Sequence, residues 1–290
     1  MESPATMFTP RRIQSPGRPA LALFDGARQG PTVVFLHGLA RRACDWNPLI
    51  SSLNSSIHPV SLDWRGHGES DRGGGYLVED YVQDLQAILP LIAHHPVILV
   101  GHSLGALVAA EMACREPSKI AAVVLEDPPT PGFLQQLDST GYYDLFKAYV
   151  RWGGTPVTVP HLAAELARLE IMGPLGKKRP LGQMRDSASL RFMAHCLKSM
   201  DPACPMPVLN GQWLQGIQLG QSLRGIQCPV LLLRGDPAFG GMMPAAETDA
   251  LFTPVADLTR LDWTGVGHQI HGTATEAMAR ALWAFLPTVG

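Results

Sequence analysis

The chain has 290 residues, of which 46% are hydrophobic, which is enough for one large domain with an insertion. Its formal net charge of −2 gives no electrostatic basis for binding nucleic acid or anionic lipid. The five cysteines are scattered and form no Cys-x-x-Cys pair, which argues against a zinc site or a disulfide framework and favours a reducing cytoplasm.

The N-terminal segment is rich in proline, arginine and serine, and residues 1–12 are predicted to be a flexible arm. Met1–Arg18 has no apolar run of signal-peptide length. No stretch of 18 apolar residues occurs either, so we expect no membrane span and a cytoplasmic location. The oligomeric state is left open, with a homodimer as one option.

Short apolar runs alternate with segments of helical periodicity, which predicts a mostly parallel sheet covered on both faces. The expected strands are Pro19–Phe24, Pro31–Leu36, His58–Leu62, Pro96–Val100, Ile120–Leu125, Cys228–Leu233 and Leu258–Leu261. The expected helices are Leu77–Ala93, a segment that starts near Ala106, and Thr275–Phe285.

This alternation of strands and helices stops between Thr130 and Gln227, where helical segments, prolines and glycines occur without a convincing strand. We interpret residues 130–227 as a helical cap inserted into the sheet domain. The core is then formed by residues 1–129 and 228–290.

Gly101-His102-Ser103-Leu104-Gly105 lies between a predicted strand and a predicted helix. A G-x-S-x-G pattern in that context is typical of a nucleophile elbow, a sharp turn that presents the serine hydroxyl at the sheet edge. Ser103 is therefore the candidate nucleophile.

A serine nucleophile needs a base, and in a nucleophile-elbow fold the base follows late in the chain. His268 is the best candidate, because it lies in a glycine-bearing loop after the last predicted strand. His271 is a weaker alternative. His161 and His195 fall in the predicted cap, which is less suited to a fixed base.

The base needs a carboxylate to orient it, and the residues alone leave this acid open. Asp127 and Asp236 each follow a predicted strand at the same sheet edge, and Glu126 is a third option. Both aspartates precede a proline. An aspartate at such a position can instead cap a turn with its carboxylate.

The chain resembles the α/β-hydrolase superfamily with a helical cap. The resemblance is carried, in order, by His37-Gly38-Leu39, Asp63-Trp64-Arg65-Gly66-His67-Gly68-Glu69-Ser70, the Gly101–Gly105 elbow and Gly267-His268. It implies an oxyanion hole made of the backbone amides of Leu39 and Leu104. Trp64, Arg65 and His67 are expected to support the neighbouring loop.

The resemblance also bears on the acid. Most members place it in a glycine-x-x-aspartate pattern after the penultimate strand, but Ala238 holds that place after Gly235. A minority, including one branch of haloalkane dehalogenases and the zearalenone-type lactonases, places it 24 positions after the nucleophile. Asp127 stands at that spacing from Ser103 and is favoured over Asp236 and Glu126.

The predicted cap is rich in aromatic residues and methionine, which favours a small to medium apolar substrate. These cap residues are Phe133, Leu134, Tyr142, Tyr143, Phe146, Tyr149, Trp152, Met172, Met184, Met193 and Trp213. As pocket residues we select the cap tryptophans Trp152 and Trp213 together with Trp46 and Trp64.

The sequence thus predicts a serine hydrolase that cleaves an ester or lactone of a small molecule through an acyl-enzyme, without a metal or organic cofactor. A carbon–carbon bond hydrolase or an acyltransferase would use the same triad. A ligand receptor on this scaffold, with little turnover, is the alternative from another class. A serine at the elbow argues against the alkyl-enzyme chemistry of dehalogenases and epoxide hydrolases.

Overall fold

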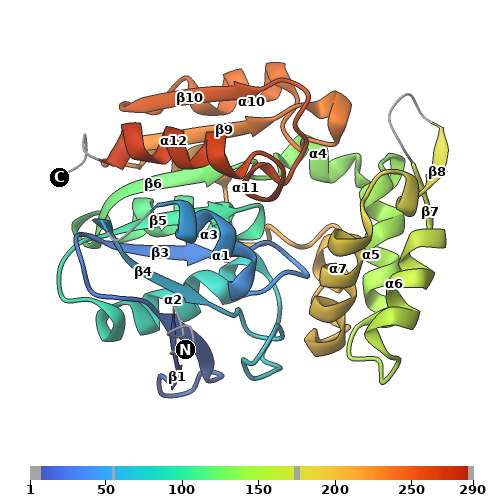
Figure 1. Ribbon diagram of the computed structural model, residues 1–290. Coiled ribbons are helices and arrows are strands. Elements are labelled where there is room, and N and C mark those ends of the chain that lie inside the picture. The colour runs from blue at the N-terminus through green and yellow to red at the C-terminus, as the bar shows by residue number, and fades with distance from the viewer. Residues whose placement is uncertain (1–7, 54–55, 173–176, 287–290) are drawn as a thin grey trace.

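Eight strands form one sheet in the order β1-β2-β4-β3-β5-β6-β9-β10 in the computed structural model, which describes residues 8–53, 56–172 and 177–286 (Figure 1). Strand β2 is antiparallel to both of its neighbours, β1 and β4, and all the other neighbouring pairs in the sheet are parallel. The strands are β1 Thr9–Ile13, β2 Leu21–Asp25, β3 Thr32–Leu36, β4 His58–Leu62, β5 Val97–His102, β6 Ile120–Glu126, β9 Val230–Gly235 and β10 Leu258–Trp263.

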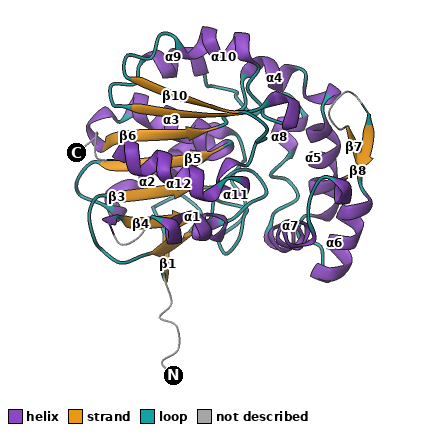
Figure 2. Ribbon diagram, turned by 45° about the horizontal axis from the view of Figure 1, so that its top comes forward, coloured by secondary structure: helices purple, strands orange, loops and turns teal. Residues whose placement is uncertain are grey.

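Helices cover both faces of this sheet, because alternate residues of its central strands are apolar on both sides (Figure 2). In β3, Val34 and Leu36 face one core cluster, whereas Val33 and Phe35 face the other. The first cluster is covered by α2 Val78–Ile92, α3 Leu104–Arg115, α9 Leu219–Arg224 and α10 Ala245–Phe252. The second is covered by α1 Asn47–Ser52, α11 Ile270–Thr273 and α12 Thr275–Phe285.

A group of helices lies beyond the carboxyl ends of the parallel strands (Figure 1). It contains α5 Gly141–Trp152, α6 Val159–Arg168, α7 Ser187–Ser199 and the antiparallel pair β7 Glu170–Met172 and β8 Lys178–Pro180, with the short α4 Pro131–Gln135 and α8 Met206–Leu209 at its base. We propose this group as the cap. The strand pair was not expected in this region. Helix α9 lies before residue 227, within the predicted cap, but it packs against α3 on the sheet.

The N-terminal segment differs from the sequence prediction. Residues Thr9–Ile13 form the edge strand β1 on β2, so the flexible arm expected over residues 1–12 is a paired strand from Thr9 onward. Residues 1–7 lie outside the described residues. Besides the backbone ladder with β2, Arg12 donates to the carbonyl of Glu69 at 2.8 Å and Arg11 lies 3.4 Å from Asp25.

None of the described helices is both long enough and apolar enough to cross a bilayer. The helix after the elbow, α3, instead packs directly on the sheet. A Cβ placed on Gly105 would lie 2.0 Å from the carbonyl oxygen of Leu36 in β3, far inside van der Waals contact. Only glycine therefore permits the close approach of this helix to the central strand.

A buried chain of charges fastens α11 beneath the carboxyl end of the sheet. Arg41 donates through Nε to Asp45 at 2.6 Å, and Asp45 lies 3.2 Å from Nε2 of His271. On its other side, Nδ1 of His271 lies 2.8 Å from Glu126 at the end of β6. Burial would lower the pKa of His271, but the two carboxylates raise it to about 10. At neutral pH this ring is therefore an imidazolium held between two carboxylates.

We expect Gly105→Ala to lower the free energy of unfolding by about 1–3 kcal/mol, because the added methyl group must displace the backbone of β3. Gly272→Ala is the matched control, since nothing lies within 4 Å of a Cβ at that position. Its effect should stay within about 0.5 kcal/mol. Urea unfolding measures both, and equal stability of the two variants would contradict the close approach.

The buried charges also predict a pH dependence. Because folding raises the pKa of His271, its contribution is complete below about pH 6.5 and is lost as pH rises toward about 10. The wild type should exceed His271→Gln in free energy of unfolding by more at pH 7 than at pH 10. Urea unfolding at both pH values measures this difference, and a gap that does not narrow would show that His271 is uncharged when folded.

Candidate active site

Ser103 occupies a strained turn between β5 and α3. Its backbone angles are φ 54° and ψ −112°, and its amide donates to the carbonyl of Glu126 at 2.9 Å. The flanking glycines make the turn possible, because a Cβ on Gly101 would lie 2.2 Å from the carbonyl oxygen of Gly105. Positive φ at a serine persists only where surrounding structure enforces it, and such strain is common at reactive residues.

His268 lies in the loop after β10 and its Nδ1 is 2.7 Å from Oδ2 of Asp127. Asp127 directly follows β6, has φ 44° and is fully buried. Its carboxylate also accepts hydrogen bonds from the amides of Gly235 at 2.9 Å and Met242 at 2.8 Å. These two amides fix the carboxylate, which in turn fixes the histidine ring with its other nitrogen, Nε2, available for proton transfer.

The other two candidate acids have different partners. The carboxylate of Asp236 accepts from the amides of Ala238 and Gly265, both at 2.9 Å, which lowers its pKa. It therefore caps the turn that the following proline suggested. Glu126 holds His271. Within the described residues, neither acid has a hydrogen bond or an ion pair with His268.

Two backbone segments meet at Ser103 where the oxyanion hole was expected. Leu104 begins α3, and the amide at the first position of a helix has no partner within that helix. The loop that carries Leu39 passes close to the nucleophile, because a Cβ on Gly38 would lie 3.2 Å from Cβ of Ser103. Leu39 also lines the cavity beside Ser103.

Two buried histidines support that loop. Nε2 of His37 accepts from the amide of Trp64 at 3.0 Å, and Nε2 of His67 accepts from the amide of Ala40 at 3.1 Å. Burial lowers the pKa of His67 to about 4 and holds that of His37 well below its usual value. Both rings are therefore neutral, as accepting a hydrogen bond requires.

The two cap histidines lie away from this site. His161 is exposed, and His195 is bonded to Arg42 at 2.9 Å. Neither lines the cavity at Ser103 as the described residues define it.

One group of ligand-type side chains lies beneath the nucleophile, where atoms of His102, Glu126 and His271 fall within 4.8 Å of one another. As an imidazolium, His271 is protonated on both nitrogens and has no lone pair to offer a metal ion; carboxylate oxygens lie 2.8 Å from its Nδ1 and 3.2 Å from its Nε2. This group is better described as a buried ion pair beside a neutral histidine. Burial, and to a lesser extent the neighbouring imidazoles of His268 and His271, hold the pKa of His102 well below its usual value.

A cavity of about 580 Å³ opens beside Ser103 and His268, between the sheet domain and the cap. That volume suits a small-molecule substrate. Seven of the aromatic and methionine residues singled out in the cap line it: Phe133, Tyr142, Phe146, Tyr149, Met172, Met184 and Met193. Tyr142 joins the cap to the core, because its hydroxyl donates to the carbonyl of Gly240 at 2.6 Å and its ring centre is 5.6 Å from that of His268.

The structure places the four selected tryptophans elsewhere. Trp46 is buried between Phe35 and His271, with ring centres 5.5 and 4.4 Å away. Trp64 is also buried and donates through Nε1 to the carbonyl of His37 at 2.8 Å. Both therefore support the core.

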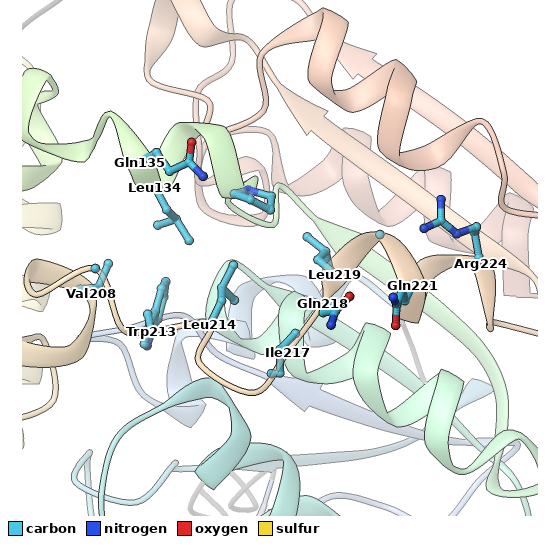
Figure 3. Close-up of a pocket in the computed structure, with 13 residues that line it drawn as sticks. Leu134, Gln135, Val208, Trp213, Leu214, Ile217, Gln218, Leu219, Gln221 and Arg224 are labelled. Carbon is cyan, nitrogen blue, oxygen red and sulfur yellow. The ribbon is translucent and has the colours of Figure 1, made fainter.

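The two cap tryptophans are likewise outside this cavity. The ring of Trp152 lies 4.8 Å from the guanidinium of Arg151. Trp213 lines a separate cavity of about 470 Å³, opposite Leu134 of α4 (Figure 3). Large apolar side chains were predicted to be buried, but their size does not indicate which cavity they face.

Three lining residues that the sequence analysis did not single out carry positive charge: Arg41, Arg179 and Arg185. No motif surrounds them, and a cap arginine that faces a cavity has the same local sequence pattern as one that faces solvent.

Residues 31–201 match the family model described as alpha/beta hydrolase fold. A 2-(acetamidomethylene)succinate hydrolase from Mesorhizobium japonicum is 26% identical over 89% of this chain and 88% of its own length.

Among solved structures, an E-2-(acetamidomethylene)succinate hydrolase shares the fold with a TM-score of 0.76, at 24% identity over 97% of this chain and 99% of the other. The enol-lactonase of Burkholderia xenovorans has a TM-score of 0.71, at 19% identity over 96% of this chain and 100% of the other. Sheet order, elbow and family match agree, and the chain belongs to the alpha/beta hydrolase fold family.

Proposed function

We propose that this hydrolase cleaves an ester or lactone through an acyl-enzyme on Ser103, with His268 as base and Asp127 as its orienting acid. One observation carries the proposal: His268, whose Nδ1 lies 2.7 Å from the buried carboxylate of Asp127, lines the same cavity as Ser103 on its strained elbow. A serine, a histidine and a buried carboxylate in this arrangement are the parts that acyl transfer requires.

In the first half of the reaction, Nε2 of His268 takes the proton of the Ser103 hydroxyl as the oxygen attacks the acyl carbon. The amides of Leu39 and Leu104 stabilise the negative charge on the acyl oxygen. His268 then returns the proton to the leaving alkoxide, and the carbon–oxygen bond breaks. Asp127 stays ionised and stabilises the imidazolium that forms transiently.

In the second half, His268 takes a proton from water, and the resulting hydroxide attacks the acyl-enzyme. Collapse of the second tetrahedral intermediate releases the acid and returns the proton to Ser103. When the substrate is a lactone, acid and alcohol leave as one molecule. Cap residues form part of the cavity wall, and a wall that displaces bulk water strengthens the interactions of the developing charge.

The reaction class is supported by the residue at the elbow. A serine there forms an acyl-enzyme, whereas epoxide and haloalkane opening on this fold needs a carboxylate in its place. The enol-lactonase among the similar structures is named for a reaction of the proposed class.

We expect Asp127→Asn to lower kcat for p-nitrophenyl butyrate by about ten-thousandfold, because an amide donates to His268 and favours the wrong tautomer. Asp236→Asn is the matched control, and its kcat should stay within about threefold of the wild type, since Asp236 contacts only loop amides. Steady-state release of nitrophenolate measures both. A larger loss in Asp236→Asn would overturn the assignment of the acid.

A further inference from the structure

The cavity at Ser103 has a pronounced charge imbalance. Three arginines line it, and no aspartate or glutamate does so within the ranges that the structure describes. A cavity with fixed positive charge and no internal counter-charge favours a negatively charged ligand.

The three arginines differ in what already neutralises them. Arg41 belongs to the buried charge chain, where its guanidinium bonds Asp45 and lies 4.7 Å from the ring centre of Phe192. Arg179 is exposed and Arg185 is half-buried, and neither side chain has an ion pair or a side-chain hydrogen bond with any described residue. Asp186 is next to Arg185 in sequence, but its carboxylate accepts from the amide of Ser189 and begins α7.

Both uncompensated arginines belong to the cap. Arg179 lies in β8 directly opposite Ile171 of β7, so the two side chains leave the same face of the strand pair, and both line the cavity. Arg185 follows β8 and precedes α7. Arg185 lines the cavity together with Tyr142, whose ring centre is 5.6 Å from that of His268.

A guanidinium matches a carboxylate in shape and charge and forms paired hydrogen bonds with it. Since Ser103 lies on the sheet domain and the two arginines lie on the cap, a substrate that uses both must carry its acyl group and its carboxylate at different ends. The lining between them is mostly apolar, which suits a short hydrocarbon spacer.

We propose that Arg179 and Arg185 form an anion subsite that binds a free carboxylate at the end of the substrate remote from the scissile acyl group. This rests on the proposed function, because the acyl end is assigned to Ser103. The substrate class is then a monoester or lactone of a short dicarboxylic acid, rather than a wholly apolar ester.

Two nitrophenyl esters of equal chain length test the subsite: mono-p-nitrophenyl glutarate, which carries the carboxylate, and p-nitrophenyl pentanoate, which does not. We expect the wild type to have the higher kcat/KM for the glutarate ester. Arg179→Gln and Arg185→Gln should each lower the ratio of the two kcat/KM values about tenfold, mainly through KM of the glutarate ester, because a charged hydrogen-bond partner is lost.

Arg191→Gln is the matched control, since this exposed arginine lies on α7 of the cap but does not line the cavity. In this control the ratio of the two kcat/KM values should equal that of the wild type. Arg185→Lys keeps the positive charge and should therefore retain part of the preference for the glutarate ester. A variant that merely disturbs folding lowers both esters together and leaves the ratio intact. An unchanged ratio in both glutamine variants overturns the subsite.

Calorimetric titration of glutarate into Ser103→Ala separates this proposal from the proposed function. Glutarate should bind, and adding Arg179→Gln and Arg185→Gln should weaken that binding about tenfold or more. Such binding without any hydrolysis by the wild type would retain the subsite and remove the hydrolase assignment. Hydrolysis of both esters at equal kcat/KM, with no glutarate binding, would retain the hydrolase assignment and remove the subsite.

Discussion

The carboxylate of Asp127 is the point on which the active site depends. It is fully buried and accepts hydrogen bonds from the amides of Gly235 and Met242 and from Nδ1 of His268. These contacts join the end of β6, the end of β9 and the two loops that follow β9 and β10. A carboxylate that only accepts fixes the proton on Nδ1 and so leaves Nε2 unprotonated, as the base that we propose for Ser103 must be.

The end of β6 holds two carboxylate–histidine pairs with different consequences. Asp127 holds His268 at the cavity, whereas Glu126 holds His271 inside the protein. The second pair has a further carboxylate, which keeps that ring charged and removes it from proton transfer near neutral pH. The neutral His102 ring separates the pairs, with centres 4.5 and 4.9 Å from the two histidines.

The sequence predicted the central strands β3, β5, β6 and β9 well, because each is a nearly continuous apolar run that a polar loop ends. It could not choose between Asp127 and Asp236 without the family resemblance, since both follow strands at one sheet edge and only three-dimensional contacts separate them. It missed β1, in which Ile13 is the only buried residue of five. The tryptophans and Arg179 show the same limit, because composition predicts burial but not the direction of a side chain.

Covalent labelling of the nucleophile tests the central claim most directly. A fluorophosphonate should form one adduct on the wild type, located on Ser103 by peptide mass mapping, because Ser103 stands on a strained elbow and lines the cavity together with the carboxylate-held His268. Ser103→Ala should stay unlabelled, and Asp127→Asn should label far more slowly than Asp236→Asn. An unlabelled wild type, or an adduct that persists in Ser103→Ala, would contradict the account.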